Sequence, residues 1–388
     1  MAATTATEGE VLSAQPPGPD PGPGTGGEPA PTARRALRQG LAVAVALVVV
    51  VVAPLVLSEF RLALLAKYLV FAVVAIGLNL AWGYGGMLSL GHGVFFGLGA
   101  YCTAMHFKLA DARSGLPDFM TWSGVESLPA IWAPFRSAWF ALPAAVLVPM
   151  VLAALLGASV FRRRVRGAYF ALLTQALAAA FAILLVGQQG LTGGTNGLTN
   201  ITEVFGLELG NPRSTQVLFF VAAGAVAATF LIARQVVQSR FGRLLMAVRD
   251  GEDRVRFLGY DANRVKVLAF SLSAGMAGLA GALFVPIVGI VSPANVGVVP
   301  SIEMVIWVAI GGRATLAGPI VGALVVSSAH TSLSEWYPGG WLYLQGALFV
   351  VTMVWAPRGL AGLAEVVRRR REHDRAGARA EVAVGTAS

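Results

Sequence analysis

The sequence predicts an all-α integral membrane protein: a polytopic bundle of about eight full spans plus a helical hairpin, roughly ten hydrophobic helices in all. Of its 388 residues, 56% are hydrophobic and 13% are charged, whereas a soluble domain carries about 25% charged residues. Mean hydropathy is +0.69. A helix needs roughly 20 residues to cross the hydrocarbon core, and the apolar runs that meet or approach this length are 41–57, 62–82, 138–160, 169–186, 217–233 and 341–356.

Composition divides the chain into three parts. Residues 1–33 are rich in Pro, Gly, Ala and Thr and have almost nothing to bury, which predicts a disordered tail. Residues 34–360 hold all the long apolar runs and form the predicted transmembrane domain. Residues 361–388 form a basic tail. The first apolar run is too long for the core of an ordinary signal peptide, so we expect it to remain as a membrane anchor.

Basic residues are distributed unevenly between the loops, and this predicts the orientation. Cytoplasmic loops of membrane proteins are enriched in Lys and Arg. We therefore place on the cytoplasmic side the segments that carry 22 of the 29 basic residues: 33–39, 83–86, 162–166, 234–266 and 357–388. Both termini are then cytoplasmic. The same rule accounts for the net charge of +9, so we expect membrane lipid around the chain and no nucleic acid partner.

The segment 301–328 is predicted to be a helical hairpin. With 234–266 and the basic tail both cytoplasmic, 267–291 leaves and 341–356 returns, so 301–328 must leave and return on one side. Its middle, GGRATLAGP, contains the glycines and the proline at which a broken helix pair would turn. Interrupted helices of this kind are common in transport paths. A single tilted helix is the alternative.

The stretch 239–266 does not fit a lipid environment, because eleven of its 28 residues are charged. The apolar residues that recur there at helical spacing are Phe241, Leu244, Leu245, Val248, Val255 and Leu258. This spacing predicts one or two short amphipathic helices over 241–258. Gly251 is a candidate break and Gly259 a candidate left-handed cap. The opposite face mixes charges of both signs, from Arg249 to Arg256, which favours docking of another protein over lipid binding. A solvated loop is the alternative.

Motifs for chemistry are absent from the sequence. No G-x-x-x-x-G-K-[ST] occurs, so the chain has no P-loop for ATP. The single cysteine, Cys102, excludes an internal disulfide and a cysteine-cluster metal site. No H-E-x-x-H or carboxylate pair at metal-ligand spacing is present, so we predict no metal, no bound cofactor and no enzymatic activity. The chain combines a charged docking helix with the lack of an ATP site of its own. This combination fits a permease subunit that is driven by separate ATPases.

Two stretches carry a family resemblance. RFGRLLMAVRDGEDRVRFLGYDANRVKVLAFSLSAGMAGLAGALF at 240–284 resembles the coupling region of permeases in the branched-chain amino-acid ABC transporter family, and GYGGMLSLGHGVFFGLGAY at 83–101 resembles that family's second conserved block. The resemblance covers roughly 40–360. It implies a bacterial plasma membrane protein with a homologous second permease, two ABC ATPases that use ATP, and an extracytoplasmic substrate-binding protein. It also implies that the coupling segment 234–266 contacts the ATPase, through Arg249, Glu252, Asp253, Arg254 and Gly259.

Within that family, four further stretches resemble the urea permease branch: VRGAYFALLTQAL at 165–177, GGTNGLTN at 193–200, GLPDFMTW at 115–122 and SIEMVIWVAIGGRATLAG at 301–318. The resemblance implies urea as the substrate. Urea is neutral, with N–H donors and one carbonyl acceptor, so its path calls for amides and hydroxyls rather than ion pairs. Branched-chain amino acids or short-chain amides are the alternative substrates. An ATP-independent channel or secondary transporter is the alternative from another class.

The candidate residues of the substrate path are the polar side chains inside predicted spans: Asn79, Ser89, Thr174, Gln175 and the acid Glu303. Polar side chains in spans also hold helices together, so a packing role is the alternative at each position. A carboxylate within the membrane is a functional candidate. For Glu303 the alternative is an interfacial residue that faces water or caps its helix.

Overall fold

The computed structural model describes residues 48–112, 115–313, 315–336 and 340–355. Residues 48–52, which are helical, belong to an N-terminal unit; residues from 53 onward form a second unit, to which everything below refers. The predicted tails 1–33 and 361–388 lie outside the described residues, as do residues 41–47 of the first apolar run.

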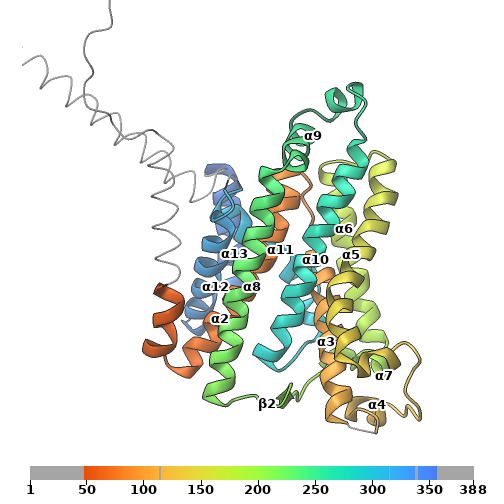
Figure 1. Cartoon of the computed structure of the whole chain (residues 1–388), viewed down its shortest axis with the longest axis vertical. Helices are drawn as coiled ribbons and strands as arrows, with labels where there is room; N and C mark the ends of the chain where they lie inside the picture. Colours follow the sequence, from red (N-terminus) through yellow and green to blue (C-terminus); the bar gives the residue numbers. More distant parts are fainter. Residues whose placement is uncertain (1–47, 113–114, 314, 337–339, 356–388) are drawn as a thin grey trace, which may run out of the picture. The chain divides into compact units, whose positions relative to one another are not determined.

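The second unit is a bundle of helices, which confirms the predicted all-α membrane architecture (Figure 1). Its long helices are α2 (Glu59–Asn79, continued by the π-helical turn η1, Leu80–Tyr84), α3 (His92–Asp111), α5 (Ala138–Arg162), α6 (Ala168–Gly187), α8 (Pro212–Gln238), α9 (Arg240–Phe257), α10 (Ala262–Val288), α11 (Val298–Gly311), α12 (Gly318–Trp336) and α13 (Trp341–Trp355). Short elements join them: α4 (Asp118–Trp122), η2 (Ala133–Arg136), α7 (Gln189–Thr192), η3 (Gly194–Asn196), η4 (Pro293–Asn295) and the hairpin β1 (Glu203–Val204) with β2 (Leu207–Glu208).

Six stretches among the described residues are long and apolar enough to cross a membrane: 59–84, 138–162, 168–187, 212–238, 262–288 and 293–311. They agree with the predicted spans 62–82, 138–160, 169–186, 217–233 and 267–291. The predicted total of about ten is not confirmed. One predicted span, 341–356, corresponds to α13, which has only 15 residues.

α10 lies at the centre of the packing and contacts α3, α5 and α2, and α3 and α5 also contact each other. Its sequence GMAGLAG allows this close approach. A Cβ atom at Gly281 would lie 1.9 Å from the carbonyl oxygen of Phe96 in α3, and one at Gly278 would lie 2.4 Å from that of Ala145 in α5. Small residues let helix backbones meet where lipid supplies no hydrophobic driving force. Only glycine fits at these two contacts.

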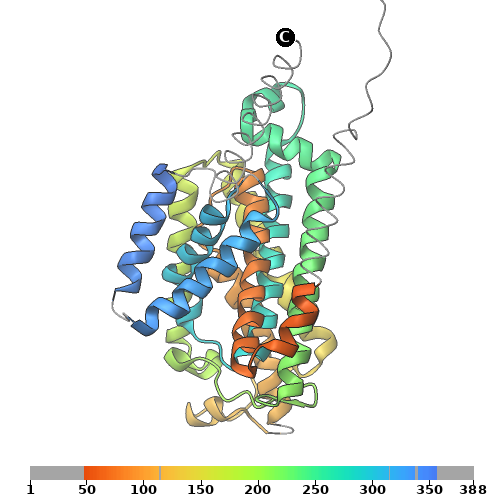
Figure 2. The ribbon, with the colours of Figure 1, turned by 90° about the vertical axis from the view of Figure 1, so that its left-hand side faces the viewer.

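The hairpin predicted at 301–328 is present as a broken helix pair. α11 ends at Gly311, Gly312 has a positive φ of 108°, and α12 begins at Gly318. The two helices pack against each other, and Figure 2 shows both beside the core of the bundle. The expected break at GGRATLAGP is therefore confirmed over the alternative of one continuous helix.

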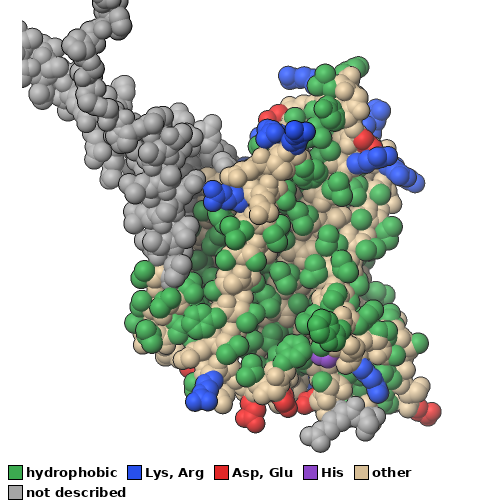
Figure 3. Space-filling view, in the orientation of Figure 1, with side chains coloured by type: hydrophobic (Ala, Val, Ile, Leu, Met, Phe, Trp, Pro, Cys, Tyr) green, Lys and Arg blue, Asp and Glu red, His purple; other side chains and the backbone are tan. Residues whose placement is uncertain are grey.

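The two ends of the bundle differ in charge. α9 projects beyond one end, whereas α4, α7 and the β-hairpin form the other (Figure 1). In Figure 3, Lys and Arg side chains gather around the α9 end and most Asp and Glu side chains lie at the opposite end. The distribution of basic residues along the sequence predicted this difference in charge between the two ends.

Candidate functional site

The site is built on α9, whose boundaries follow from local sequence signals. The Ser239 hydroxyl oxygen accepts a hydrogen bond from the Gly242 amide (3.2 Å) and caps the start of the helix. Gly251 leaves the helical conformation, with φ −167° and ψ 71°, and divides α9 into two halves. Gly259, with φ 85°, ends the segment. The predicted pair of short helices, the break and the left-handed residue are all confirmed.

The buried face of α9 continues across the kink but ends before Leu258. Leu245, Val248 and Val255 are buried as expected, but Leu258 is 76% exposed and Phe257 is 92% exposed. Helical spacing placed Leu258 on the apolar face, but α9 ends at Phe257 and Leu258 is its C-cap residue. The apolar side chains at the end of the helix are therefore exposed.

Glu252 is buried, which corrects the prediction that it stands on the exposed mixed-charge face. Its side chain is only 8% exposed, and three cations surround its carboxylate. Oε2 lies 2.5 Å from Lys266 Nζ and 3.1 Å from Arg166 Nε, while Oε1 lies 2.8 Å from Arg256 Nη2. Arg166 belongs to the loop between α5 and α6, and Lys266 belongs to the first turns of α10. Glu252 therefore joins three elements.

The cations decide the charge state of Glu252. Burial alone would raise the pKa of this carboxyl, but hydrogen bonds from Lys266 and Arg256 and the positive charges of Lys266 and Arg166 outweigh burial and lower the pKa. Glu252 is therefore ionised at neutral pH. Asp253, next to it, also pairs with Arg166, at 3.2 Å, but its side chain is 73% exposed.

Arg249 anchors the first half of α9. Its Nη1 donates a 2.7 Å hydrogen bond to the carbonyl oxygen of Gly83 in η1, and its Nε pairs with Asp250 at 2.8 Å. The contact with η1 fixes this half of α9 to the end of α2. Arg254 is exposed, and Gly259 is exposed beside the apolar residues that follow the kink.

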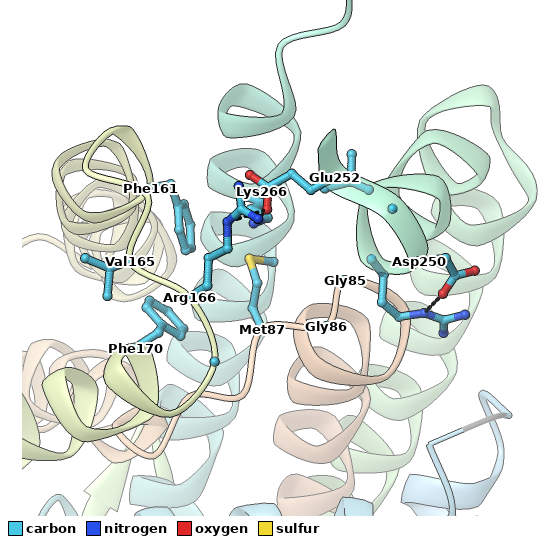
Figure 4. Close-up of a pocket in the computed structure, with 14 residues that line it drawn as sticks. Gly85, Gly86, Met87, Phe161, Val165, Arg166, Phe170, Asp250, Glu252 and Lys266 are labelled. Atoms are coloured by element: carbon cyan, nitrogen blue, oxygen red, sulfur yellow. Dashed lines mark hydrogen bonds and ion pairs between the residues drawn. The ribbon is translucent and has the colours of Figure 1, made fainter. Parts of the chain in front are cut away.

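A cavity of about 260 Å³ lies between α9 and the bundle. Figure 4 shows Arg166 and Lys266 directed toward Glu252 on one side of it, with Met87, Phe161 and Phe170 nearby. On α9 the cavity is lined by Val248–Glu252, the end of the first half and the kink. Sequence reasoning missed Arg166 and Lys266 as partners of Glu252. Their only signals were a basic loop and a lysine at the start of a span.

The predicted substrate-path residues lie apart from this site, and three of them hold the fold together. Asn79 is fully buried, and its Nδ2 donates to the carbonyl oxygen of Thr315 at 3.1 Å. The Thr174 hydroxyl oxygen accepts from the Leu90 amide at 3.0 Å. Ser89 is buried beside it and accepts from the Gly91 amide at 3.4 Å. Gln175 is half-buried.

Glu303 is paired rather than isolated. Its Oε1 lies 3.1 Å from Nδ1 of His330 in α12, and the side chains are 17% and 40% exposed. The charge of Lys67 in α2 also acts on Glu303. Next to them, the Tyr68 hydroxyl donates to the Thr331 hydroxyl at 2.5 Å. This group, which we call the Glu303 cluster (Lys67, Glu303 and His330), places both signs of charge within the bundle.

The helical bundle, its apolar spans and the polar α9 segment define a multi-pass membrane protein with a structured segment outside the spans. Residues 60–355 match the family model described as "Branched-chain amino acid transport system / permease component". The chain belongs to this family, whose members are permease components of transport systems. No solved structure matches the chain.

Three curated relatives illustrate the similarity. The high-affinity branched-chain amino acid transport system permease protein LivM of Salmonella typhimurium is 29% identical over 331 residues, which cover 79% of this chain and 71% of LivM. The corresponding permease protein LivH of Escherichia coli is 24% identical, over 76% of this chain and 92% of LivH. The autoinducer 2 import system permease protein LsrC of an Enterobacter species is 29% identical over 50% of this chain and 57% of LsrC.

Proposed function

We propose that this chain is one of two membrane subunits of an ATP-driven importer in the bacterial plasma membrane, with its α9 end in the cytoplasm. A homologous second permease completes the path, two ABC ATPases bind ATP and dock at α9, and an extracytoplasmic binding protein delivers the substrate. LivM and LivH support the pairing, because both are named as permease proteins of the same type of transport system. Transport proceeds by alternating access as the ATPases close.

The observation that carries this proposal is the α9 segment. It projects beyond the spans (Figure 1), it is fixed to the bundle by Arg249 and Glu252, and it presents exposed charged and apolar side chains. A channel or a secondary transporter needs no such structure. A motor that closes on the cytoplasmic side needs a rigid element on which to act.

We propose urea as the substrate. The support is the set of stretches that resemble the urea permease branch, among them the Thr174–Gln175 pair and the SIEMVIWVAIGGR stretch at 301–313. The hydroxyls of Ser89 and Thr174 and the Nδ2 of Asn79 already form hydrogen bonds within the chain, so these residues support the path only indirectly. Gln175 is the predicted amide that remains half-exposed.

Branched-chain amino acids are the second candidate, and a specific observation favours them. The Glu303 cluster places an acid and two basic side chains close together in the bundle, which would suit the ammonium and carboxylate of an amino acid. The names of LivM and LivH point the same way for those proteins.

The test is uptake of radiolabelled urea and leucine in parallel by the complete complex in proteoliposomes, with and without internal ATP. A matched complex with a hydrolysis-deficient ATPase is the control. ATP-dependent urea uptake with no leucine uptake supports both parts of the proposal. Leucine uptake alone would refute urea and keep the ATP-driven importer. Urea flux that is the same with both ATPases would refute the importer and leave a channel.

A further inference from the structure

We propose that the face of the bundle formed by α2 and α12 lines a water-filled path through the membrane, and that the Glu303 cluster on this face is a binding site for a small polar molecule. The ligand carries N–H donors next to a carbonyl or carboxylate oxygen, a chemistry that urea and amino acids share. This inference rests on the proposed function, because it takes the transported substrate as the ligand. It adds Lys67, Trp307 and Ser327 to the candidate residues and assigns one side of the bundle to the path.

The Glu303 cluster lies far from both ends of the spans that carry it. Glu303 is near the middle of the span 293–311. Lys67 lies within the span 59–84, about 12 Å from its start at a helical rise of roughly 1.5 Å per residue. His330 of α12 is at the same depth, because its Nδ1 is 3.1 Å from Oε1 of Glu303. Charged side chains at such depth are costly against lipid, and they face the interior of a bundle or water.

The cluster is not enclosed by the helices. The side chain of His330 is 40% exposed and that of Glu303 is 17% exposed, and Lys67 is also partly exposed. Two polar residues on either side of His330 in α12, Ser328 and Ser332, are exposed as well. α12 packs on α2 here (Figure 2). An ion pair that only held helices together in lipid would be sealed between them, whereas this one opens onto the surface of the described part of the chain.

The outer faces of two other spans have the opposite character. The exposed residues of α8 between 217 and 232 are all apolar or glycine: Val217, Phe220, Val221, Gly224, Ala227, Ala228, Leu231 and Ile232. The exposed residues of α6 between 172 and 187 are also all apolar or glycine. Such faces suit lipid, where polar side chains are rare. The charges that reach the surface within the spans lie on the side of α2 and α12, so this is the side that water wets.

The site offers both kinds of hydrogen-bonding group. The Glu303 carboxylate is an acceptor and the Lys67 ammonium is a donor. Two buried groups nearby have no hydrogen-bond partner among the described residues: Nε1 of Trp307 and the hydroxyl of Ser327, in residues that are 2% and 3% exposed. Trp307 is one turn from Glu303 on α11, and Ser327 is one turn from His330 on α12. Both groups can donate to an oxygen of a ligand.

An aromatic ring connects Lys67 with Trp307. Nζ of Lys67 lies 5.7 Å from the centre of the Phe71 ring, and this ring stacks on Trp307 with the centroids 4.7 Å apart. The donors of Lys67 and Trp307 therefore belong to side chains that contact the same ring. In the proposed site, Glu303 accepts from the N–H groups of the ligand, while these donors bind its carbonyl or carboxylate oxygen. Such an oxygen also satisfies a buried donor that is costly to leave unpaired.

The water-filled path is tested by thiol labelling of Ser328→Cys. The chain has a single cysteine, Cys102, which is buried, so an introduced thiol can be followed by itself. The matched control is Ala227→Cys on the apolar face of α8. A charged thiol reagent is supplied on both sides of proteoliposomes with the complete complex, and labelling of this chain is measured by mass. Because the thiolate is the reactive form and apolar surroundings disfavour it, we expect Ser328→Cys to react at least tenfold faster. Equal rates would refute the path on this face.

Ligand binding is tested by protection of the Ser328→Cys thiol, with urea and leucine added separately to the same complex. We expect one of them to slow labelling at least threefold. Glu303→Gln should remove this protection, whereas Glu335→Gln, which changes an exposed acid further along α12, should keep it. Protection by urea supports an amide ligand, and protection by leucine supports a zwitterion at the same site. Protection by neither, or protection that survives Glu303→Gln, would refute the site.

A role of Glu303 in packing alone would lower the melting midpoint of Glu303→Gln but leave the protection in place. If Glu303→Gln does not fold, Lys67→Gln replaces it, and we again expect the protection to be lost. Labelling and protection need no ATP, whereas the proposed importer is refuted by uptake that is the same with a hydrolysis-deficient ATPase. Failure of this site and failure of the proposed function are therefore distinguishable.

Discussion

We expect the single methyl group added in Gly281→Ala to lower the stability of the bundle strongly, because α10 packs closely against α3 at this position. The added Cβ would lie 1.9 Å from the carbonyl oxygen of Phe96 and 2.8 Å from the amide nitrogen of Ala100, both in α3. Real Cβ atoms essentially never approach closer than 3.0 Å. The neighbour here is backbone, which cannot rotate away as a flexible side chain can. The two helices must therefore separate by about 1 Å or more.

A second close backbone contact of α10 lies one turn away. At Gly278 the hypothetical Cβ would be only 2.4 Å from the Ala145 carbonyl oxygen in α5. Overpacking of a close-packed interior costs about 1–3 kcal/mol and occasionally more. Because the atoms that would clash with the added methyl group belong to the backbone and cannot rotate away, we expect the upper end, about 3 kcal/mol. That value is a large fraction of the typical stability of a folded protein.

The assay is thermal unfolding of the detergent-purified permease pair, followed by the loss of its monodisperse peak. The matched control is Gly224→Ala in α8, where a Cβ would meet nothing within 4 Å. Replacing a helical Gly by Ala with no steric cost stabilises a helix by up to about 1 kcal/mol. We expect Gly281→Ala to melt several degrees below wild type and Gly224→Ala to melt at or above it. Equal midpoints for Gly281→Ala and wild type would refute the close contact between α3 and α10.

Two further predictions concern the α9 end. Asp261 caps α10 by accepting from the amides of Asn263 and Arg264 at 3.0 and 3.3 Å, so Asp261→Ala should lower the free energy of unfolding by about 1 kcal/mol; an unchanged melting midpoint would contradict this cap. The pKa of Glu252 is lowered below its ordinary value of 4.5, so the stability that its ionised form contributes is complete above pH 4.5 and is lost as the pH falls toward the lowered pKa. The difference in midpoint between wild type and Glu252→Gln should therefore be constant near neutral pH and shrink in acid, and a difference that grows in acid would reverse this sign.

Sequence alone was sufficient where the determining signals are local. The break between α11 and α12 was predictable because GGRATLAGP contains the residues that end helices, and the kink and cap of α9 were predictable from Gly251 and Gly259. The long spans were predictable from hydropathy. The total number of spans was not, since α13 has only 15 helical residues and residues 41–47 of the first apolar run lie outside the described residues.

The burial of Glu252 was not predictable, because its partners come from separate segments. Arg166 precedes it by 86 positions, and Lys266 belongs to the next helix, 14 positions further on. Helical periodicity assigns a residue to a face but does not say what packs on that face. The end of the helix at Phe257 added a second error, because Leu258 follows it and is exposed. The hydroxyl of Thr174 was likewise ambiguous, because its partner is the backbone of a loop 84 positions away.

α10 carries both the ion pair with Glu252 and the closest backbone contacts of the bundle. Lys266 stands in the first turns of α10, and the glycines that lock α10 between α3 and α5 follow in its middle, at Gly278 and Gly281. The ion pair thus ties α9 to the same helix that packs most closely on α3 and α5. Glu252→Gln and Gly281→Ala should therefore both lower the melting midpoint at neutral pH. Only the effect of Glu252→Gln should shrink in acid, because only that variant removes a titrating carboxylate.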